Sequence, residues 1–190
     1  MKELYIKERT FKGQVFPGKG IQEADYEACT FRNCDFSEGD LSQMDFVDCL
    51  FIECNLSLTR LNGTLFQESE FKSCKMLGMP FENCNEFGLS VVFEHCLLDN
   101  SSFVKVTMPG VRFNACHLHY VDFSEADLSG AVFSKSDLLG AVMNRTGLEK
   151  ADFREAVNFA IDPEKNRLKG AVFSATNLSG LLVKYGLDIR

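Results

Sequence analysis

The sequence predicts a solenoid, a fold in which short repeated units stack along one axis. An apolar residue occupies every fifth position from Phe11 to Phe81, in 15 of 15 places. The same spacing then resumes two residues out of phase and runs from Phe93 to Phe153. A period of five matches neither the 3.6-residue period of a helix nor the two-residue alternation of a strand. Repetition at a short fixed period indicates that each unit buries its apolar side chains by stacking on its neighbours.

The segment before the repeat is expected to cover its open end. Strand edges at the end of a stack invite aggregation unless another segment covers them. Residues 1–12 are available for this at the N-terminus. Leu4 and Ile6 are the apolar side chains that we expect to contact the first repeat.

The period breaks once near the middle of the chain, over residues 85–92, which read NEFGLSVV. Glu86 stands where an apolar residue is expected, and the following repeats are displaced by two positions. We expect a bulge or short loop on one face. Two interpretations stay open: a tolerated two-residue insertion, or a projecting contact point for a partner.

The C-terminal end combines a pause in the repeat with a helical pattern. The period lapses at Asn158 and Pro163, within residues 158–167, and returns at Leu168. The chain then carries Leu178, Leu181, Leu182 and Tyr185 at the spacing of one helix face, followed by Gly186. We expect an α-helix over about 175–185, with Ser174 or Thr176 as its N-cap, that covers the last repeat.

Units such as ADLSG at 126–130 and TNLSG at 176–180 resemble the pentapeptide repeat family. The resemblance extends over about residues 10–183. It implies an all-β solenoid, a right-handed quadrilateral parallel β-helix in which one pentapeptide forms each side of a four-sided coil. It also implies that the central Phe or Leu and the small residue two places before it point inward. We therefore expect one domain over 1–190, with coils over about 10–174 and a C-terminal helix and dimerisation tail over about 175–190.

All eight cysteines occupy the small inward position, and several recur at intervals of four pentapeptides, as Cys29 and Cys49 do. In the implied fold they stack one coil above another. Free cysteine is a small and often buried hydrophobic residue. Stacked residues lie about 4.8 Å apart with parallel Cβ directions, which does not favour a disulfide. We expect structural thiols and no disulfide.

The C-terminal segments NFAIDPEKNRLKGAVFS and LLVKYGLDI resemble one branch of this family more closely. That branch contains the quinolone-resistance (Qnr-type) proteins and related immunity proteins against gyrase-directed toxins. Residues 54–78 are also similar to it. The resemblance implies a dimer formed through the C-terminal tail. The residues expected in that interface are Leu178, Leu181, Leu182, Tyr185, Leu187 and Ile189.

The charge of the chain is uneven, although the net charge is −7. Residues 23–70 contain 11 acidic and 2 basic residues, whereas residues 91–190 contain 12 acidic and 11 basic residues. The N-terminal half should therefore repel nucleic acid and attract a basic partner. The alternative interpretation is an acidic surface that only serves solvation.

These observations lead to the hypothesis of a DNA-mimicking protein that binds DNA gyrase or topoisomerase IV. A four-sided β-helix is a rod about as wide as duplex DNA, and carboxylates along one side would imitate its phosphates. The resemblance implies protection against quinolones or gyrase-targeting toxins. Few insertions interrupt this chain, so it resembles the loop-poor members, for which gyrase binding is better supported than quinolone protection. The expected topoisomerase-facing residues are Asp25, Glu27, Asp45, Asp48, Glu68 and Glu86.

The sequence contains no phosphate-binding loop, nucleophile elbow or paired-carboxylate motif, so we expect neither an enzyme nor a cofactor. Ligand-type residues do occur together in Cys116-His117-Leu118-His119. Because Cys116 is expected to point inward and the histidines flank an inward Leu118, we expect them not to converge on one tetrahedral ion, and we predict no metal site. The competing hypothesis is a scaffold protein with a different protein partner.

The N-terminal MKELYIKERTFKGQ lacks the apolar stretch of a signal peptide, and no run of about 18 apolar residues could cross a membrane. We therefore expect a cytoplasmic protein that contacts neither membrane nor nucleic acid directly.

Overall fold

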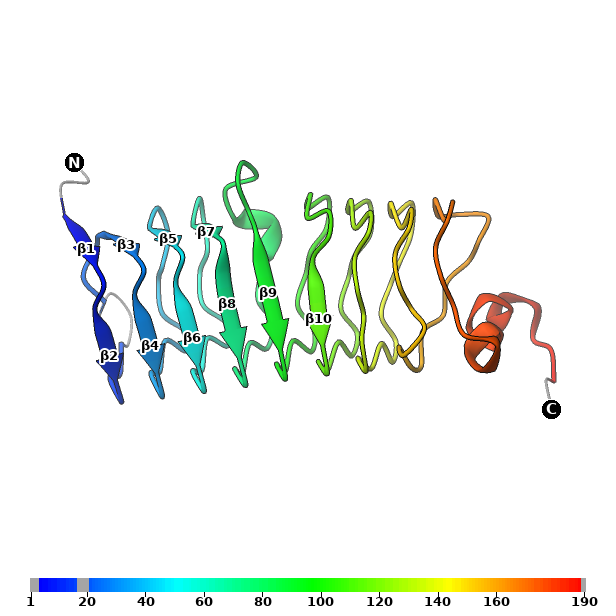
Figure 1. Cartoon of the computed structure of the whole chain (residues 1–190), viewed down its shortest axis with the longest axis horizontal. Helices are drawn as coiled ribbons and strands as arrows, with labels where there is room; N and C mark the ends of the chain where they lie inside the picture. The colour runs from blue at the N-terminus through cyan, green and yellow to red at the C-terminus, as the bar shows by residue number, and fades with distance from the viewer. Residues whose placement is uncertain (1–3, 17–20, 189–190) are drawn as a thin grey trace.

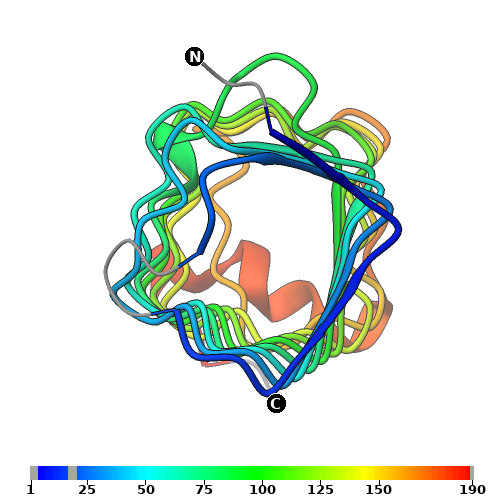
Figure 2. The same ribbon diagram turned by 90° about the vertical axis from the view of Figure 1, so that its left-hand side faces the viewer.

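The computed structural model describes residues 4–16 and 21–188, and the chain winds into a rod (Figure 1). Viewed along the rod, the coils superpose as a four-sided outline (Figure 2). The fold is the expected right-handed quadrilateral parallel β-helix. Its strands are short: β1 (Tyr5–Lys7), β2 (Thr10–Lys12), β3 (Asp25–Glu27), β4 (Thr30–Arg32), β5 (Asp45–Val47), β6 (Leu50–Ile52), β7 (Leu65–Gln67), β8 (Ser69–Lys72), β9 (Val91–Glu94) and β10 (Arg112–Asn114).

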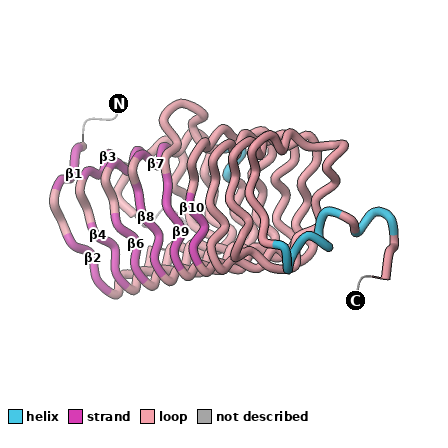
Figure 3. Tube along the Cα trace, turned by 45° about the vertical axis from the view of Figure 1, so that its right-hand side comes forward, coloured by secondary structure: helices cyan, strands magenta, loops and turns pink. Residues whose placement is uncertain are grey.

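Two sides of the rod carry parallel sheets, ordered β1-β3-β5-β7 and β10-β9-β8-β6-β4-β2. Figure 3 shows that these strands lie in the N-terminal part of the rod, while the later coils are drawn as loops. The later coils are nevertheless in register, because single bridges such as His117↔Asp137 connect them. Strand pairing follows the expected coil of four pentapeptides, as in Phe31↔Phe51, and a two-residue insertion enters at Phe71↔Phe93. The expected phase break is therefore confirmed.

The inward positions form a continuous phenylalanine column. Phe51, for example, stacks between Phe31 and Phe71 with ring centroids 4.8 Å apart on each side. Burial of these rings away from water is the main stabilising contribution to such a stack. The column contains Phe11, Phe31, Phe51, Phe71, Phe93, Phe113, Phe133, Phe153 and Phe173.

The small inward positions are also as expected. All eight cysteines are free thiols, and seven are buried, while Cys84 is half-buried at the end of the 3₁₀ helix η1 (Phe81–Asn83). The Cys49 thiol donates to the carbonyl of Tyr26, 23 residues earlier, and the Thr64 hydroxyl donates to the carbonyl of Leu41 in the same way. Burial raises the pKa of Cys49 to about 12, so this thiol stays protonated and structural.

The first described residues differ from the expected cap. They form β1 and β2, which are the first coil itself and pair with β3 and β4. Ile6 is buried as expected, whereas Leu4 is 41% exposed. The pattern of Ile6 and Phe11 already follows the five-residue period, which is why this segment joins the stack. Residues 1–3 lie outside the described part of the chain.

The C-terminal helix begins and ends where expected, but it is not an α-helix. It consists of two 3₁₀ helices, η2 (Ala175–Leu181) and η3 (Val183–Tyr185), and Gly186 ends it in the left-handed conformation with φ 59°. Ser174 takes the N-cap position without a side-chain capping bond. Asn177 and Gly180 both contact the last coils, and their spacing of three residues matches one 3₁₀ turn. This packing explains the tighter helix.

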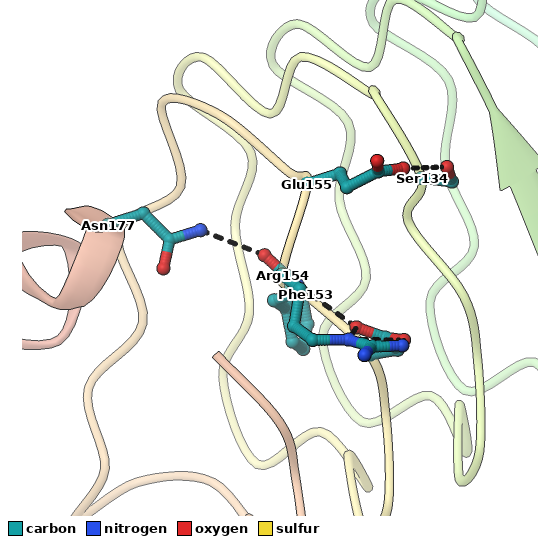
Figure 4. Close-up of polar contacts among 6 residues, drawn as sticks. Ser134, Phe153, Arg154, Glu155 and Asn177 are labelled. Atoms are coloured by element: carbon teal, nitrogen blue, oxygen red, sulfur yellow. Dashed lines mark hydrogen bonds and ion pairs between the residues drawn. The ribbon is translucent and has the colours of Figure 1, made fainter. Parts of the chain in front are cut away.

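Asn177 also closes the end of the stack (Figure 4). Its side-chain Nδ2 donates to the backbone carbonyls of Phe153 at 2.9 Å and Ala156 at 3.1 Å. Gly180 is buried, and a Cβ at this residue would lie 2.4 Å from Cε2 of Phe159. The covering helix therefore lies directly on the last coil, as the sequence predicted for this end.

Among the described residues, no helix is long and apolar enough to cross a membrane.

Candidate functional site

The expected acidic residues follow the side of the rod formed by β1, β3, β5 and β7, together with the corner after each strand. We call this side the acidic face. Asp25 and Asp45 occupy successive coils, and the backbone N–H of Asp45 donates to Oδ1 of Asp25 at 3.3 Å. Asp48 and Glu68 occupy equivalent corners, with φ values of 52° and 51°. Because equivalent positions recur once per coil, Asp25 and Asp45 form one column and Asp48 and Glu68 form a second column on the same side of the rod.

One residue of the set is electrically compensated. Nζ of Lys7 lies 2.7 Å from Oε1 of Glu27, one coil away. Sequence reasoning missed this pair, although the two residues occupy equivalent positions in successive coils. By contrast, Asp48, Glu68 and Glu86 are exposed and form no salt bridge with any residue in the described part of the chain. Glu27 shares its column with Val47 and Gln67, and neither of these two residues carries a charge. The negative potential of this side is therefore concentrated at the corners.

Residues 91–190 contain 12 acidic residues, and cations on neighbouring coils neutralise several of them. Glu125 pairs with Arg145, and Oε1 of Glu149 lies 2.9 Å from Nε of Arg167. The partners in each pair are about one coil apart, so these acidic side chains are neutralised by basic side chains of the same wall. The asymmetry in the sequence therefore becomes an asymmetry along the rod, with uncompensated carboxylates near the N-terminal end.

The phase break forms a loop over residues 85–90 that projects from the rod next to β7 (Figures 1 and 2). Backbone N–H groups of Asn85 and Ser90 donate to the carbonyls of Thr64 and Phe66, which attaches both ends of the loop to the acidic face. Oδ1 of Asn85 accepts the N–H of Phe87 at 3.0 Å. The ring of Phe87 is 78% exposed at the tip. Glu86 is therefore on this loop rather than in the next regular coil, because the inserted residues move it out of the wall.

The residues expected in a dimer interface fall into two groups. Leu178, Leu182, Tyr185 and Leu187 are between 36% and 59% exposed. Leu181 differs from the expectation, because it is partly buried against the core of the last coils. The carbonyl of the preceding residue, Gly180, accepts the N–H of Ile161, which holds this part of the helix against the last coils. Ile189 lies outside the described residues. A groove of about 840 Å³ between the last coils and the helix is lined in part by Leu182 and Leu187.

Cys116 is buried, as expected, and does not join His117 and His119, but the two histidines lie close to Asp99 of the preceding coil. One ligand atom from each of Asp99, His117 and His119 lies within 4.8 Å of the other two. Leu118 is buried, so both imidazoles project from the same outer wall. The signal that could have revealed the cluster is that His119 follows Asp99 by one coil in the sequence.

The fold and these surfaces define a repeat protein with a fully packed interior, whose outer faces are available for binding. The family model described as a pentapeptide repeat region matches residues 24–88 and 81–153. This chain belongs to the pentapeptide repeat family. No curated protein matches the sequence.

Two solved structures are similar to this chain. A trypsin-treated variant of QnrB1, described as a plasmid-mediated fluoroquinolone resistance protein, is similar with a TM-score of 0.63 and 19% identity over 98% of each chain. A second trypsin-treated variant of QnrB1 has a TM-score of 0.48 and 22% identity, also over 98% of each chain. At 19% identity the likeness to the first of these structures establishes the fold alone.

Proposed function

We propose that this protein binds a type II topoisomerase, either DNA gyrase or topoisomerase IV, in the groove that the enzyme uses for duplex DNA. The observation that carries the proposal is the set of exposed carboxylates formed by Asp48 and Glu68 at successive corners and by Glu86 on the adjoining loop, which no basic side chain of the described residues neutralises. Duplex DNA presents about one negative charge per 1.7 Å of its axis, so proteins that bind it offer basic grooves. An acidic rod of similar width is complementary to such a groove.

Occupation of this groove would account for the protection against quinolones or gyrase-targeting toxins that the sequence resemblance implies. A bound rod would compete with DNA for the enzyme and would deny quinolones or peptide toxins their enzyme–DNA target. An excess of the rod would inhibit the enzyme itself. We place this binding protein in the cytoplasm with its target and assign it no catalytic step. Two copies joined through Leu178, Leu182, Tyr185 and Leu187 would form a longer rod with an acidic face at each end.

The acidic face is tested by charge reversal. We expect Asp45→Lys combined with Asp48→Lys to weaken binding to gyrase by about tenfold or more, since two repulsive charges replace two attractive ones. Binding is measured by biolayer interferometry with immobilised gyrase at low and physiological salt. The loss should be largest at low salt, where charges on the two surfaces are screened least.

A matched control changes the same coil positions on another part of the rod. Asp122→Lys combined with Glu125→Lys alters residues with the same three-residue spacing, and Glu125 occupies a corner with φ 61° like that of Asp48. This control should retain the affinity of the unmodified protein. Equal losses in both double variants, with both proteins folded by circular dichroism, would contradict the proposed face.

The loop supplies a second, independent prediction. Phe87→Ser should weaken gyrase binding by about 30-fold, the ratio that corresponds to the roughly 2 kcal/mol of an aromatic anchor at an interface. Because the ring is 78% exposed, its removal should leave the melting temperature unchanged. Unchanged affinity would assign the loop to the other interpretation, a tolerated insertion.

One observation favours the competing function of a scaffold with another partner. The wall that contains the histidine cluster also exposes apolar side chains, among them Tyr120 at 62%, Leu139 at 45% and Val157 at 48%. Neighbouring apolar residues of this kind are typical of protein-binding surfaces. If gyrase does not bind and Leu139→Asp abolishes capture of a cellular protein, this wall would replace the acidic face as the working surface.

A further inference from the structure

The histidine cluster connects three successive coils on one wall. His117 forms bridges with Leu97 on one side and with Asp137 on the other. His119 occupies the position one coil after Asp99, and its backbone N–H donates to Oδ1 of Asp99 at 3.1 Å. Two imidazoles and two carboxylates are therefore placed together by the register of the coils itself.

The distances are close to those of a metal site. The ligand atoms of Asp99, His117 and His119 lie within 4.8 Å of one another, and the imidazole centroids are 5.3 Å apart. Zn²⁺ binds histidine nitrogen and carboxylate oxygen at about 2.0–2.2 Å, so two ligand atoms of one tetrahedral ion are about 3.3–3.6 Å apart. Small side-chain rotations would bring all three atoms onto one ion.

A second observation comes from His119. Its Nε2 atom is shielded from solvent and makes no hydrogen bond of good geometry with the described residues. Oδ2 of Asp137 nevertheless lies 3.0 Å from this nitrogen. Nδ2 of Asn158 donates to the other oxygen of Asp137 at 2.8 Å. Histidines that bind metals through one ring nitrogen usually donate the other N–H to a carboxylate. Asp137, held by Asn158, lies within reach of Nε2 and would accept its N–H after a small rotation of the imidazole.

The charges agree with a bound cation. Asp99 and Asp137 have no Lys or Arg ion-pair partner in the part of the chain that the structure describes, unlike Glu125 and Glu149 in the same half of the rod. These two carboxylates therefore lack a permanent cationic partner, and a divalent ion would compensate their charge.

We propose that Asp99, His117 and His119 bind one divalent transition-metal ion, with Asp137 and Asn158 orienting His119. Two imidazoles and one carboxylate form a ligand set that suits Zn²⁺ and leaves at least one coordination position for water or for a side chain of a partner. The ion would connect the coil that contains Asp99 to the next one. Binding to the folded state alone would also raise the melting temperature.

Zn²⁺ is the probe that tests this site. Full-length protein is freed of metal with EDTA under reducing conditions and titrated with Zn²⁺ by isothermal calorimetry. We expect one ion per chain and a rise in melting temperature. Co²⁺ is then substituted, and its absorption spectrum should show nitrogen and oxygen coordination without thiolate charge-transfer bands. Such bands would assign the metal to a cysteine, such as the half-buried Cys84, and would overturn the proposal.

Variants locate the site. His117→Asn and Asp99→Asn should each weaken Zn²⁺ binding by about tenfold or more, and Asp137→Asn by about 10- to 100-fold through loss of orientation. His95→Asn is the matched control, because the third histidine lies outside the cluster at a corner with φ 54°, a conformation that Asn adopts readily. Absence of Zn²⁺ binding, or equal affinity in His117→Asn, Asp99→Asn and His95→Asn, would overturn the proposal. Melting curves of the metal-free variants establish that each is folded.

Discussion

Phe51→Ala is expected to lower the free energy of unfolding by about 3–5 kcal/mol, the range found when a buried phenylalanine is truncated. Phe51 is fully buried, stacks on Phe31 and Phe71 at 4.8 Å, and meets the edge of Phe46 at 5.6 Å. In a solenoid each coil contacts only its neighbours, so a cavity in a central coil weakens two coil interfaces at once. Urea denaturation followed by circular dichroism measures the change.

Two controls distinguish this effect from a general intolerance of change. Phe87→Ala removes the same ring from an exposed position and should leave the urea midpoint where it is. Phe11→Ala removes a partly buried ring in the first coil, which has only one neighbouring coil, and should have a smaller effect than Phe51→Ala. A loss below about 1 kcal/mol for Phe51→Ala would contradict the role assigned to the column.

Leu182→Asp is expected to convert a dimer into a monomer. Leu182 lies at the C-terminal end of the rod with Leu178, Tyr185 and Leu187, which expose apolar surface, and it lines the groove beside the last coils. A charge introduced at a two-fold interface appears twice, so the two carboxylates would repel each other and lose solvation. Light scattering should give twice the chain mass of 21.3 kDa for the unmodified protein and the single chain mass for the variant.

Leu58→Asp is the matched control for this experiment. Leu58 is 59% exposed on the N-terminal half of the rod, far from the C-terminal helix in sequence and along the rod. Its replacement should leave the mass of the unmodified protein unchanged. A Leu182→Asp variant with the same mass as the unmodified protein would reject the C-terminal interface.

The interior could be predicted almost completely from the sequence. The five-residue period identifies Phe31, Phe51 and Phe71 as inward residues, and the recurrence of cysteines once per coil fixes which thiols lie near one another. This works because a solenoid converts sequence spacing directly into spatial neighbourhood. Gly186 could be assigned its left-handed conformation for a similar reason, since it follows the last helical residue.

The corners could not be predicted in the same way. Within residues 4–16 and 21–188, twenty residues other than glycine have positive φ, among them Asp48, Glu53 and Leu58. The left-handed conformation costs about 1–2 kcal/mol for each such residue. The backbone preferences of these residue types therefore do not predict that they occupy corners. Hydrogen bonds between coils offset the strain, as where the N–H of Asp48 donates to the carbonyl of Gln67.

The surface was predicted only in part, because side chains on neighbouring coils decide its character. The position of Asp48 and Glu68 on one edge follows from their spacing, whereas neutralisation of Glu27 depends on Lys7 one coil away. The histidine cluster was missed for the same reason. Reading residues 116–119 alone considers only one coil, while Asp99 and Asp137 come from the coils on either side.

The most direct test of the central claim is a gyrase supercoiling titration with the purified protein, with and without ciprofloxacin. The account predicts rescue of supercoiling from the drug at low protein concentration, or inhibition of supercoiling at higher concentration. The Asp45→Lys, Asp48→Lys variant should show a weaker effect than the Asp122→Lys, Glu125→Lys control. A folded protein that changes supercoiling in neither arm would contradict gyrase as the target.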